Sequence, residues 1–329
     1  MPDRILDFTD GVTMVVSDLH GDHDAFARYV GRFLQMRTRK KVDRLLLLGD
    51  LIHREGDEAQ DASLQMLLDV IRMQRTLPPG SVVMLLGNHE MPHIYGMSLA
   101  RGEVEYTPRF EKALTQSGKR DEVLTFLNSL PFMVRTGAGV TFTHAGPDGN
   151  AMANLDLLRH FDHQALIGEF DHALSINPHP EQLRTLYSQS MGMPYEVLAR
   201  YYLATSGPDD PRFDHLIRAF IIGRESPDFQ VLWDLLFTRC EFATPQPLYD
   251  RLLATFLQTV SVGAPVPQQF LVTGHIPVPG GHKEVTSQHL RIASAAHARP
   301  REAGEFLLLD FGKPITSMNQ LVKSLDKIF

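Results

Sequence analysis

The sequence has 329 residues, 43% of them hydrophobic, with a formal net charge of −7 and a single cysteine. This length allows a large buried core, and the negative charge argues against a general nucleic-acid-binding protein, which needs clustered Lys and Arg. One cysteine excludes an intrachain disulfide and leaves a metal site only nitrogen and oxygen ligands.

Targeting and membrane signals are not found in the sequence. The first residues contain no basic segment followed by an apolar one, as a secretory signal would. No apolar stretch approaches the ~18 residues that span a bilayer. We therefore expect a cytoplasmic protein that has no membrane partner.

The first half of the chain alternates between predicted strands and helices. Residues 12–17, 44–48 and 82–86 are short apolar runs, as in strands buried on both faces. Residues 24–36 and 61–74 carry apolar side chains at helical spacing and lie between those runs. The order predicts an α/β fold with parallel strands.

The segment from about residue 150 to 262 is different, because it reads mostly as helix and loop. Strand patterns resume at 270–273, 290–293 and 306–309. Because the sheet closes only after that segment, we expect residues 1–329 to form one domain. The segment 150–262 would be a helical insertion that roofs the site.

Five apolar runs each end in residues that can bind a metal. The residues at these ends are Asp18 and His20, Asp50, Asn88 with His89, His144, and His275. Active sites in α/β sheets collect at strand ends. Residues at i and i+2 of an extended strand end point to one side, so Asp18 and His20 can reach one cation. This mixture of oxygen and nitrogen ligands suits Mn²⁺, Fe or Zn²⁺ better than Ca²⁺.

A two-metal centre would give this pattern a specific use. Two ions ~3.5–4 Å apart lower the pKa of a bound water and clamp the oxygens of an in-line displacement at phosphorus. Six polar groups converging without a metal would be costly to bury. The pattern therefore predicts a two-metal hydrolase.

The motifs resemble those of the calcineurin-like metallophosphoesterase superfamily. They read Asp18-Leu-His-Gly21, Gly49-Asp50, Gly87-Asn-His-Glu90, Thr143-His-Ala-Gly146 and Gly274-His275, in the family order. The resemblance implies a four-layer α-β-β-α sandwich with a helical insertion and two divalent ions, Mn²⁺ first, with Fe or Zn²⁺ as alternatives.

The resemblance also implies roles for individual residues. Asp18, His20 and Asp50 would bind the first ion. Asp50 as the bridge, with Asn88, His144 and His275, would bind the second. His89 would be the general acid, so that the catalytic residues are His89 and Asp50. Arg54 and Asn88 would hold the phosphate of the substrate.

The sequence departs from the superfamily pattern in ways that bear on the substrate. Many members have a second His two residues after the last Gly-His, where this chain has Pro277. That difference makes the chain more similar to the phosphoprotein phosphatase branch. His53 stands where that branch has the Asp that orients the catalytic His, and Glu90 or Asp22 would have to replace it. His282 and His297 flank the last motif, and either could line the pocket.

We therefore expect a metal-dependent phosphoesterase in which metal-bound hydroxide attacks a phosphate monoester, as in Ser/Thr phosphoprotein phosphatases. The alternative substrate is a dinucleoside polyphosphate or another nucleotide, so the expected partner is a phosphorylated protein or nucleotide. A non-catalytic metal-binding interaction protein is the alternative from another class, motivated by His53 and Glu55 in the second motif.

Overall fold

Two mixed sheets form the centre of the computed structural model, which describes residues 3–101, 104–147 and 154–329. The six-stranded sheet has the order β1 (Ile5–Phe8), β7 (Met133–Thr136), β8 (Val140–Thr143), β9 (Phe270–Thr273), β12 (His289–Ile292) and β11 (His282–Thr286). The five-stranded sheet has the order β15 (Leu325–Lys327), β14 (Glu305–Asp310), β2 (Val12–Val16), β3 (Arg44–Leu47) and β4 (Val82–Met84).

The parallel strands predicted from the first half of the chain are confirmed. β2 pairs in parallel with β3, and β3 with β4. The helices between them are α1 (His23–Thr38) and α2 (Ser63–Thr76). α1 begins after Asp22, whose side chain accepts a hydrogen bond from the Ala25 N–H and satisfies one of the free donors of the first turn. This fixes the direction in which the chain leaves the first motif.

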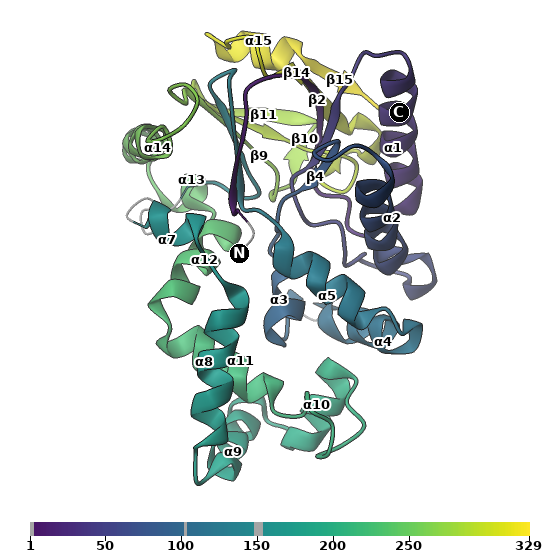
Figure 1. Ribbon diagram of the computed structural model, residues 1–329, viewed down its shortest axis with the longest axis vertical. Coiled ribbons are helices and arrows are strands. Elements are labelled where there is room, and N and C mark those ends of the chain that lie inside the picture. The colour runs from purple at the N-terminus through teal and green to yellow at the C-terminus, as the bar shows by residue number, and fades with distance from the viewer. Residues whose placement is uncertain (1–2, 102–103, 148–153) are drawn as a thin grey trace.

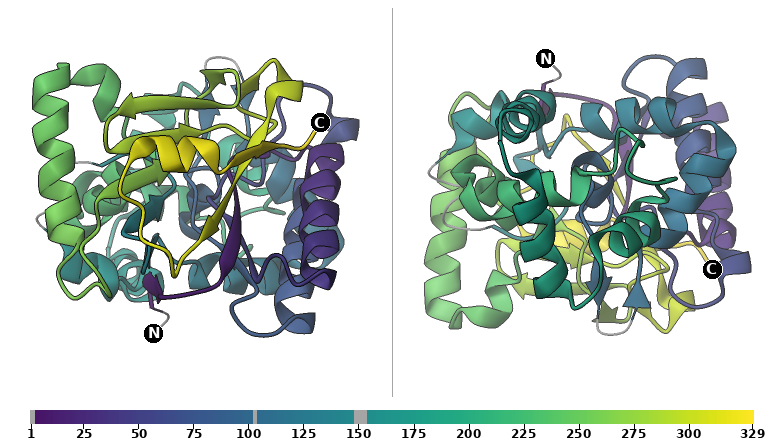
Figure 2. Two further views of the ribbon diagram at one scale, coloured as in Figure 1. Left: turned by 90° about the horizontal axis from the view of Figure 1, so that it is seen from above. Right: turned by 90° about the horizontal axis from the view of Figure 1, so that it is seen from below.

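Three sets of buried apolar side chains hold four layers together. Side chains such as Leu46 and Phe142 fill the space between the two sheets. The outer face of the five-stranded sheet packs against α1 and α2 through residues such as Phe33. The outer face of the six-stranded sheet packs against α14 (Gln246–Val260), where Leu253 is fully buried. Figure 2 shows α14 and α1 on opposite sides of the sheets. The predicted four-layer α-β-β-α sandwich is confirmed.

The helical segment after β8 extends away from the sheets (Figure 1). Its helices are α7 (Leu155–Arg159), α8 (His163–Ser175), α9 (Pro180–Met191), α10 (Tyr195–Leu203), α11 (His215–Glu225), α12 (Pro227–Phe237) and α13 (Cys240–Ala243). Helices α9 to α11 share a small apolar cluster of their own, which includes Tyr187, Leu198 and Ile217. α14 ends the segment predicted as an insertion at 150–262, yet it is a layer of the sandwich. Residues 150–153 lie outside the described ranges.

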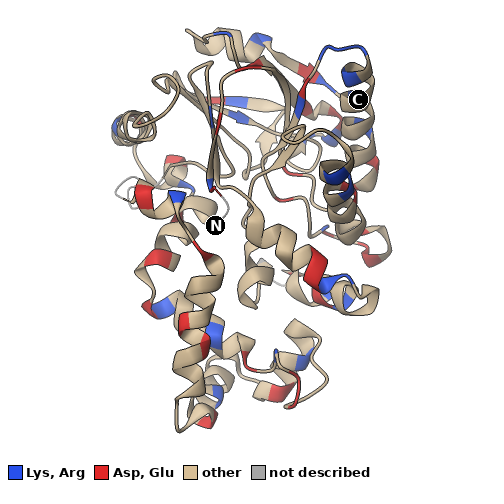
Figure 3. Cartoon of the chain, viewed as in Figure 1, with Lys and Arg blue, Asp and Glu red and all other residues tan. Residues whose placement is uncertain are grey.

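The remaining elements border the site or close the chain. They are α3 (Met91–Tyr95), α4 (Thr107–Ser117), α5 (Arg120–Ser129), α15 (Met318–Lys323), and the short strand pairs β5 (Ala100–Arg101) with β6 (Val104–Glu105) and β10 (Val278–Pro279) with β13 (Ala298–Arg299). Acidic and basic residues are interspersed along the chain in Figure 3. Over the described residues, none of the helices has the length and apolar character needed to cross a bilayer.

Candidate metal centre and active site

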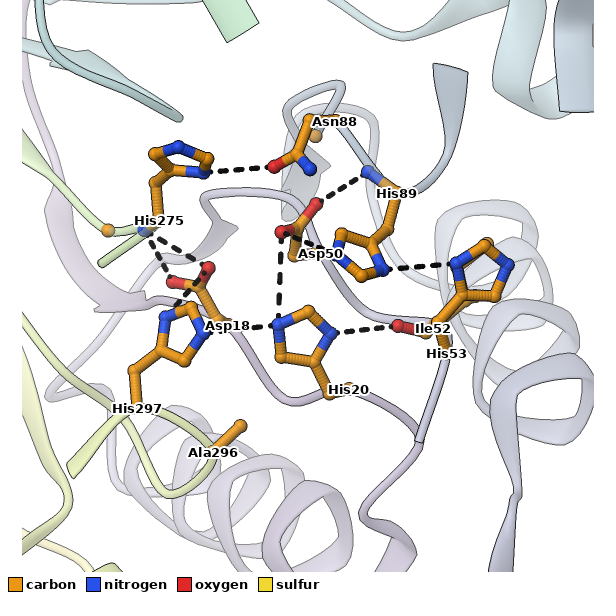
Figure 4. A network of polar contacts seen from close by, with 12 residues as sticks. Asp18, His20, Asp50, Ile52, His53, Asn88, His89, His275, Ala296 and His297 are labelled. Atoms are coloured by element: carbon orange, nitrogen blue, oxygen red, sulfur yellow. Dashed lines mark hydrogen bonds and ion pairs between the residues drawn. The ribbon is translucent and has the colours of Figure 1, made fainter. Parts of the chain in front are cut away.

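The predicted metal ligands all follow strands and meet at one edge of the two sheets. Asp18 lies two residues after β2, Asp50 three after β3, and Asn88 four after β4. His144 directly follows β8, and His275 lies two residues after β9. Figure 4 shows Asp18, His20, Asp50, Asn88 and His275 converging from different elements. The structure thus brings the six predicted ligands together.

Backbone strain is concentrated at this edge. Six non-glycine residues in the described ranges have positive φ, and four belong to the site: His20 (42°), Asp50 (50°), His53 (71°) and His275 (71°). Such conformations cost of order 1 kcal/mol or more for residues other than glycine. At the site, these conformations turn the backbone sharply in the loops that follow the strands.

Gly87 and Gly274 allow neighbouring loops to approach so closely that backbone N–H groups can donate hydrogen bonds to the ligand carboxylates. A Cβ on Gly274 would overlap the Asp18 carboxylate, and a Cβ on Gly87 would overlap Asp50. The His275 N–H, next to Gly274, donates to both oxygens of Asp18, at 3.0 and 2.9 Å. Any larger residue at these positions would push the ligand loops apart.

Glu90 braces the second and third motif loops against each other. Its carboxylate accepts hydrogen bonds from the N–H groups of Gly87 (3.2 Å), Asp50 (3.0 Å) and Leu51 (2.8 Å). Burial, together with the nearby Asp50 carboxylate, raises the pKa of Glu90 to about 7. Glu90 therefore holds the backbone at Asp50, and its hydrogen bonds within the described part of the chain do not reach His89.

The half of the site around Asn88 presents acceptor atoms to one another. His144 Nδ1 lies 2.8 Å from the Leu48 carbonyl oxygen, so Nδ1–H donates there and Nε2 is left as an acceptor. That Nε2 lies 2.8 Å from Asn88 Oδ1 and 3.4 Å from Asp50 Oδ2. His275 Nδ1 is 2.9 Å from the same Asn88 oxygen. Acceptors that face each other at these distances attract only through a shared cation.

The half of the site around His20 repeats this arrangement. His20 Nδ1 lies 3.0 Å from the Ile52 carbonyl oxygen, which again leaves Nε2 as the acceptor, 3.8 Å from Asp50 Oδ2. A histidine that donates its second N–H to a carbonyl is the usual arrangement of a metal ligand. His297 adds to this half, with Nε2 3.2 Å from His20 Nε2 and Nδ1 3.1 Å from Asp18 Oδ1.

Burial governs the charges of these groups. It lowers the pKa of His20 to about 4, helped by the neighbouring His297, so the ring is neutral and able to bind a metal. Burial and the Asp18 carboxylate raise the pKa of Asp50 well above its usual value. Two buried carboxylates repel each other, and a divalent cation between them removes that repulsion. The donor set therefore fits two divalent ions on either side of Asp50, because the ligand atoms fall into three overlapping groups: Asp18, His20 and His297; His20, Asp50 and His89; and Asp50, His144 and His275.

His89 lies at the edge of this centre and is oriented by another histidine. The backbone N–H of His89 donates to Asp50 Oδ1 (2.9 Å), and the ring Nε2 of His89 is 4.0 Å from Asp50 Oδ2. Its Nδ1 lies 3.0 Å from His53 Nδ1. Asp22, considered for this task together with Glu90, instead caps α1 and pairs with Arg301 (2.7 Å). The orienting contact thus comes from His53 itself.

A pocket of about 390 Å³ opens over these residues. Four arginines line it: Arg54, Arg239, Arg299 and Arg301. Arg54, the predicted phosphate-binding residue, is also 3.5 Å from Asp22 through Nη1 and donates to Gln60 Oε1 (3.1 Å). Cationic side chains around a two-metal cluster suit an anionic substrate.

The helical segment covers little of that pocket. Of the described residues between 154 and 262, Phe237 and Arg239 line it, whereas Leu99, Ala100 and Tyr106 come from the segment between α3 and α4. Within the described residues, α10 packs on α4 and α11 on α3. That the insertion roofs the site stays a prediction.

Three residues near the site were not assigned a role from the sequence. His297 lines the pocket, whereas His282 lies on β11 and pairs with Glu305. His93 and Glu111 are buried behind His53. One signal for His93 was present, since it lies only four residues after His89 in the sequence. The sequence carries no comparable signal for Glu111.

Fold and site define the chain as a phosphoesterase of the two-sheet type, and comparison with known proteins gives its family. A family model described as calcineurin-like phosphoesterase matches residues 12–209. The chain belongs to this family, as its motifs predicted. The match ends within the helical segment, so His275 lies beyond it.

Solved structures resemble the chain at low sequence identity. A cold-active protein tyrosine phosphatase has a TM-score of 0.52 at 15% identity, covering 98% of this chain and 82% of that one. A protein serine/threonine phosphatase from Saccharomyces cerevisiae has 0.47 at 13%, covering 98% and 82%. A metallophosphoesterase from Sphaerobacter thermophilus has 0.34 at 13%, covering 96% and 93%. At such identities, the first of these supports the fold alone. None of the curated proteins matches the chain.

Proposed function

We propose that the chain is a phosphoesterase that depends on two divalent ions and hydrolyses phosphate monoesters, as the phosphoprotein phosphatase branch does. One observation carries the proposal: the strand ends bring Asp18, His20, Asp50, Asn88, His144 and His275 together, and Nε2 of both His20 and His144 is left as an acceptor because each Nδ1–H is bonded to a backbone carbonyl. Mn²⁺ is the first candidate, and Fe and Zn²⁺ are the alternatives.

The ligands divide between the two ions as the family pattern suggests, with one addition. Asp18, His20 and Asp50 would hold the first ion, and Asp50, Asn88, His144 and His275 the second. His297 would join the first ion, because its ring touches both Asp18 and His20. It would thereby take the place of the histidine that the chain lacks at Pro277.

The chain's own residues then bind the substrate and move a proton. Bound ions would lower the pKa of a water and neutralise the phosphoryl oxygens. Asn88 and Arg54 would hold that phosphoryl group over Asp50. His89, in its protonated form and with Nδ1–H bonded to His53, would donate its Nε2 proton to the leaving oxygen as a water oxygen bonds to phosphorus and the ester P–O bond breaks. The electron pair of that bond would stay on the leaving oxygen.

The test is the release of p-nitrophenol from its phosphate ester with Mn²⁺ present. We expect turnover that chelation abolishes and that Asp50→Asn and His89→Ala both reduce. Absence of turnover across a broad phosphoester panel, in a protein that holds two ions, would instead support the non-catalytic metal-binding alternative.

A nucleotide substrate is the second candidate, and the four pocket arginines favour it. One phosphoryl group between two ions needs a single arginine, whereas a polyphosphate offers several charges to pair. Parallel assays on a phosphoserine peptide and diadenosine tetraphosphate separate the two. An Arg239→Ala or Arg299→Ala variant should raise the KM for the nucleotide alone.

A further inference from the structure

A chain of hydrogen-bonded side chains leads from His89 into the protein interior. His89 Nδ1 lies 3.0 Å from His53 Nδ1, and His53 Nε2 lies 2.8 Å from His93 Nε2. His93 Nδ1 lies 2.7 Å from Glu111 Oε1. Three imidazole rings therefore connect the edge of the pocket to a carboxylate on α4.

The inner end of this chain is a fixed negative charge. Glu111 is completely buried, and its other oxygen pairs with Arg120, with Arg212 4.0 Å away. Burial opposes ionisation, but the hydrogen bond from His93 and the charge of Arg120 outweigh it and lower the pKa of Glu111. The ionised carboxylate can only accept hydrogen bonds.

That fixed acceptor determines where each ring carries its proton. A neutral imidazole has one donor and one acceptor nitrogen. Because Glu111 accepts, His93 must carry its hydrogen on Nδ1, and its Nε2 then accepts. His53 must therefore carry its hydrogen on Nε2, and its Nδ1 accepts. His89 is left to carry a hydrogen on Nδ1 and to turn Nε2 towards Asp50.

Aromatic side chains hold the planes of these rings. The Tyr106 ring stacks on His53 with centroids 5.5 Å apart and an angle of 13°. The Phe110 ring meets His93 edge-on at 4.6 Å. Tyr106 immediately precedes α4, and Phe110 and Glu111 lie near the start of that helix, so one helix start supplies both the acceptor and the ring contacts.

We propose that Glu111, through His93 and His53, is a positioning residue that fixes the tautomer and orientation of His89. The relay rests on the proposed function, in which His89 is the general acid. It replaces the single Asp that the phosphoprotein phosphatase branch places at the position of His53. A neutral imidazole there could adopt either tautomer on its own, whereas a relay ending in Glu111 fixes one.

The first experiment reads the tautomers directly. The whole protein is labelled with ¹⁵N-histidine and loaded with Zn²⁺, which is diamagnetic, and its ring nitrogens are assigned by NMR. We expect hydrogen on Nδ1 of His93, Nε2 of His53 and Nδ1 of His89, and mixed tautomers in Glu111→Gln. Hydrogen on His53 Nδ1, or an unchanged pattern in Glu111→Gln, would overturn the proposal. This readout holds whether or not the protein is an enzyme.

The second experiment compares two substrates with different leaving groups, in order to separate a positioning role of Glu111 from a role in folding. Glu111→Gln should lower kcat for phenyl phosphate, whose leaving oxygen needs a proton, by about 10- to 100-fold. It should change kcat for 2,4-dinitrophenyl phosphate by less than about threefold, because that oxygen leaves without a general acid. The control is Glu122→Gln on α5, a surface residue paired with Lys119 and Arg75.

The outcomes distinguish the relay from the function on which it rests. If the unmodified protein cleaves neither ester, the proposed function fails, and the NMR result alone decides the relay. If Glu111→Gln slows both esters equally, the role is structural and the relay is overturned.

A variant that restores a carboxylate at position 53 gives an independent check. Asp tolerates the positive φ of His53, and the carboxylate would contact His89 without the relay. In His53→Asp, phenyl phosphate turnover should become insensitive to Glu111→Gln. If the double variant instead loses as much turnover as Glu111→Gln alone, the relay is not what connects Glu111 to His89.

Discussion

The metal half of the site and its histidine half are built in different ways. The metal half (Asp18, His20, Asp50, Asn88, His144 and His275) stands on five strand ends, and its donors are fixed by backbone groups such as Leu48 O. The histidine half (His53, His89, His93 and Glu111) comes from a loop, α3 and α4, and is held by contacts between side chains. The difference implies that the proposed metal binding would depend on the sandwich, whereas the proposed proton donation would depend on the helices beside it.

The largest effect is expected from Asp50→Asn in the metal half. Removing the shared ligand charge should lower kcat by more than the about 10²–10³-fold that one lost hydrogen-bond donor costs, because both ions lose a ligand. Phosphate release with Mn²⁺ in excess measures this. Asp156→Asn, a highly exposed residue on α7, is the matched control and should be unchanged. Full activity in Asp50→Asn would remove Asp50 from the centre.

His89→Ala should break the histidine half and leave the metal half intact. We expect a loss of about 10²–10⁴-fold in kcat for phenyl phosphate, the contribution of a general acid, with an unchanged metal content by elemental analysis. If the variant also loses its ions, the two halves are not separable in the way that their contacts indicate.

His297→Ala should weaken the binding of the first ion and leave the binding of the second ion unchanged. A lost ligand or a lost neighbour of ligands costs about 10–100-fold in metal affinity. Isothermal titration with Mn²⁺ should then show one weak and one unchanged site. His282→Ala, on the neighbouring strand β11, should bind like the unmodified protein, and equal binding by both variants would contradict a ligand role for His297.

Glu111 should make the fold sensitive to acid. Because its folded pKa is lowered below the ordinary 4.5, its ionisation stabilises the fold above that pH and the contribution is lost as the pH falls through the folded value. Glu111→Gln should cost about 3 kcal/mol at pH 7, since it leaves Arg120 without its buried partner, and less at pH 3.

Denaturant unfolding at both pH values measures that difference. Glu181→Gln, an exposed residue beside His179, should cost little at either pH. A cost of Glu111→Gln that is the same at pH 3 and pH 7 would show that Glu111 is not ionised in the folded protein.

The sequence predicted the metal half of the site much better than the histidine half, because the two halves are built in different ways. The ligands after β2, β3, β4, β8 and β9 were predictable, because a strand end places its next residues at a known edge. The relay was not, because His53, His93 and Glu111 are brought together by α3 and α4 packing on each other. His297 was named as one of two histidines that could line the pocket, but nothing local to its loop shows that it turns towards Asp18.

In the fold too, elements with a clear local pattern were predicted, whereas the way in which one of them packs was not. Short apolar runs and helical spacing predicted the sheets, α1 and α2 closely. The place of α14 was missed, because an amphipathic helix reads the same whether it packs on a sheet or on other helices. For that reason the predicted insertion took in a layer of the sandwich. We retain as a proposal that residues 1–329 act as one catalytic domain.

The number of divalent ions bound per chain tests the central claim most directly. The purified protein, equilibrated with Mn²⁺ and freed of excess ions, is measured by elemental analysis beside Asp50→Asn. We predict two ions per chain in the unmodified protein and at most one in the variant. Fewer than two ions in the unmodified protein at saturation, or the same number in both proteins, would contradict a two-metal centre bridged by Asp50.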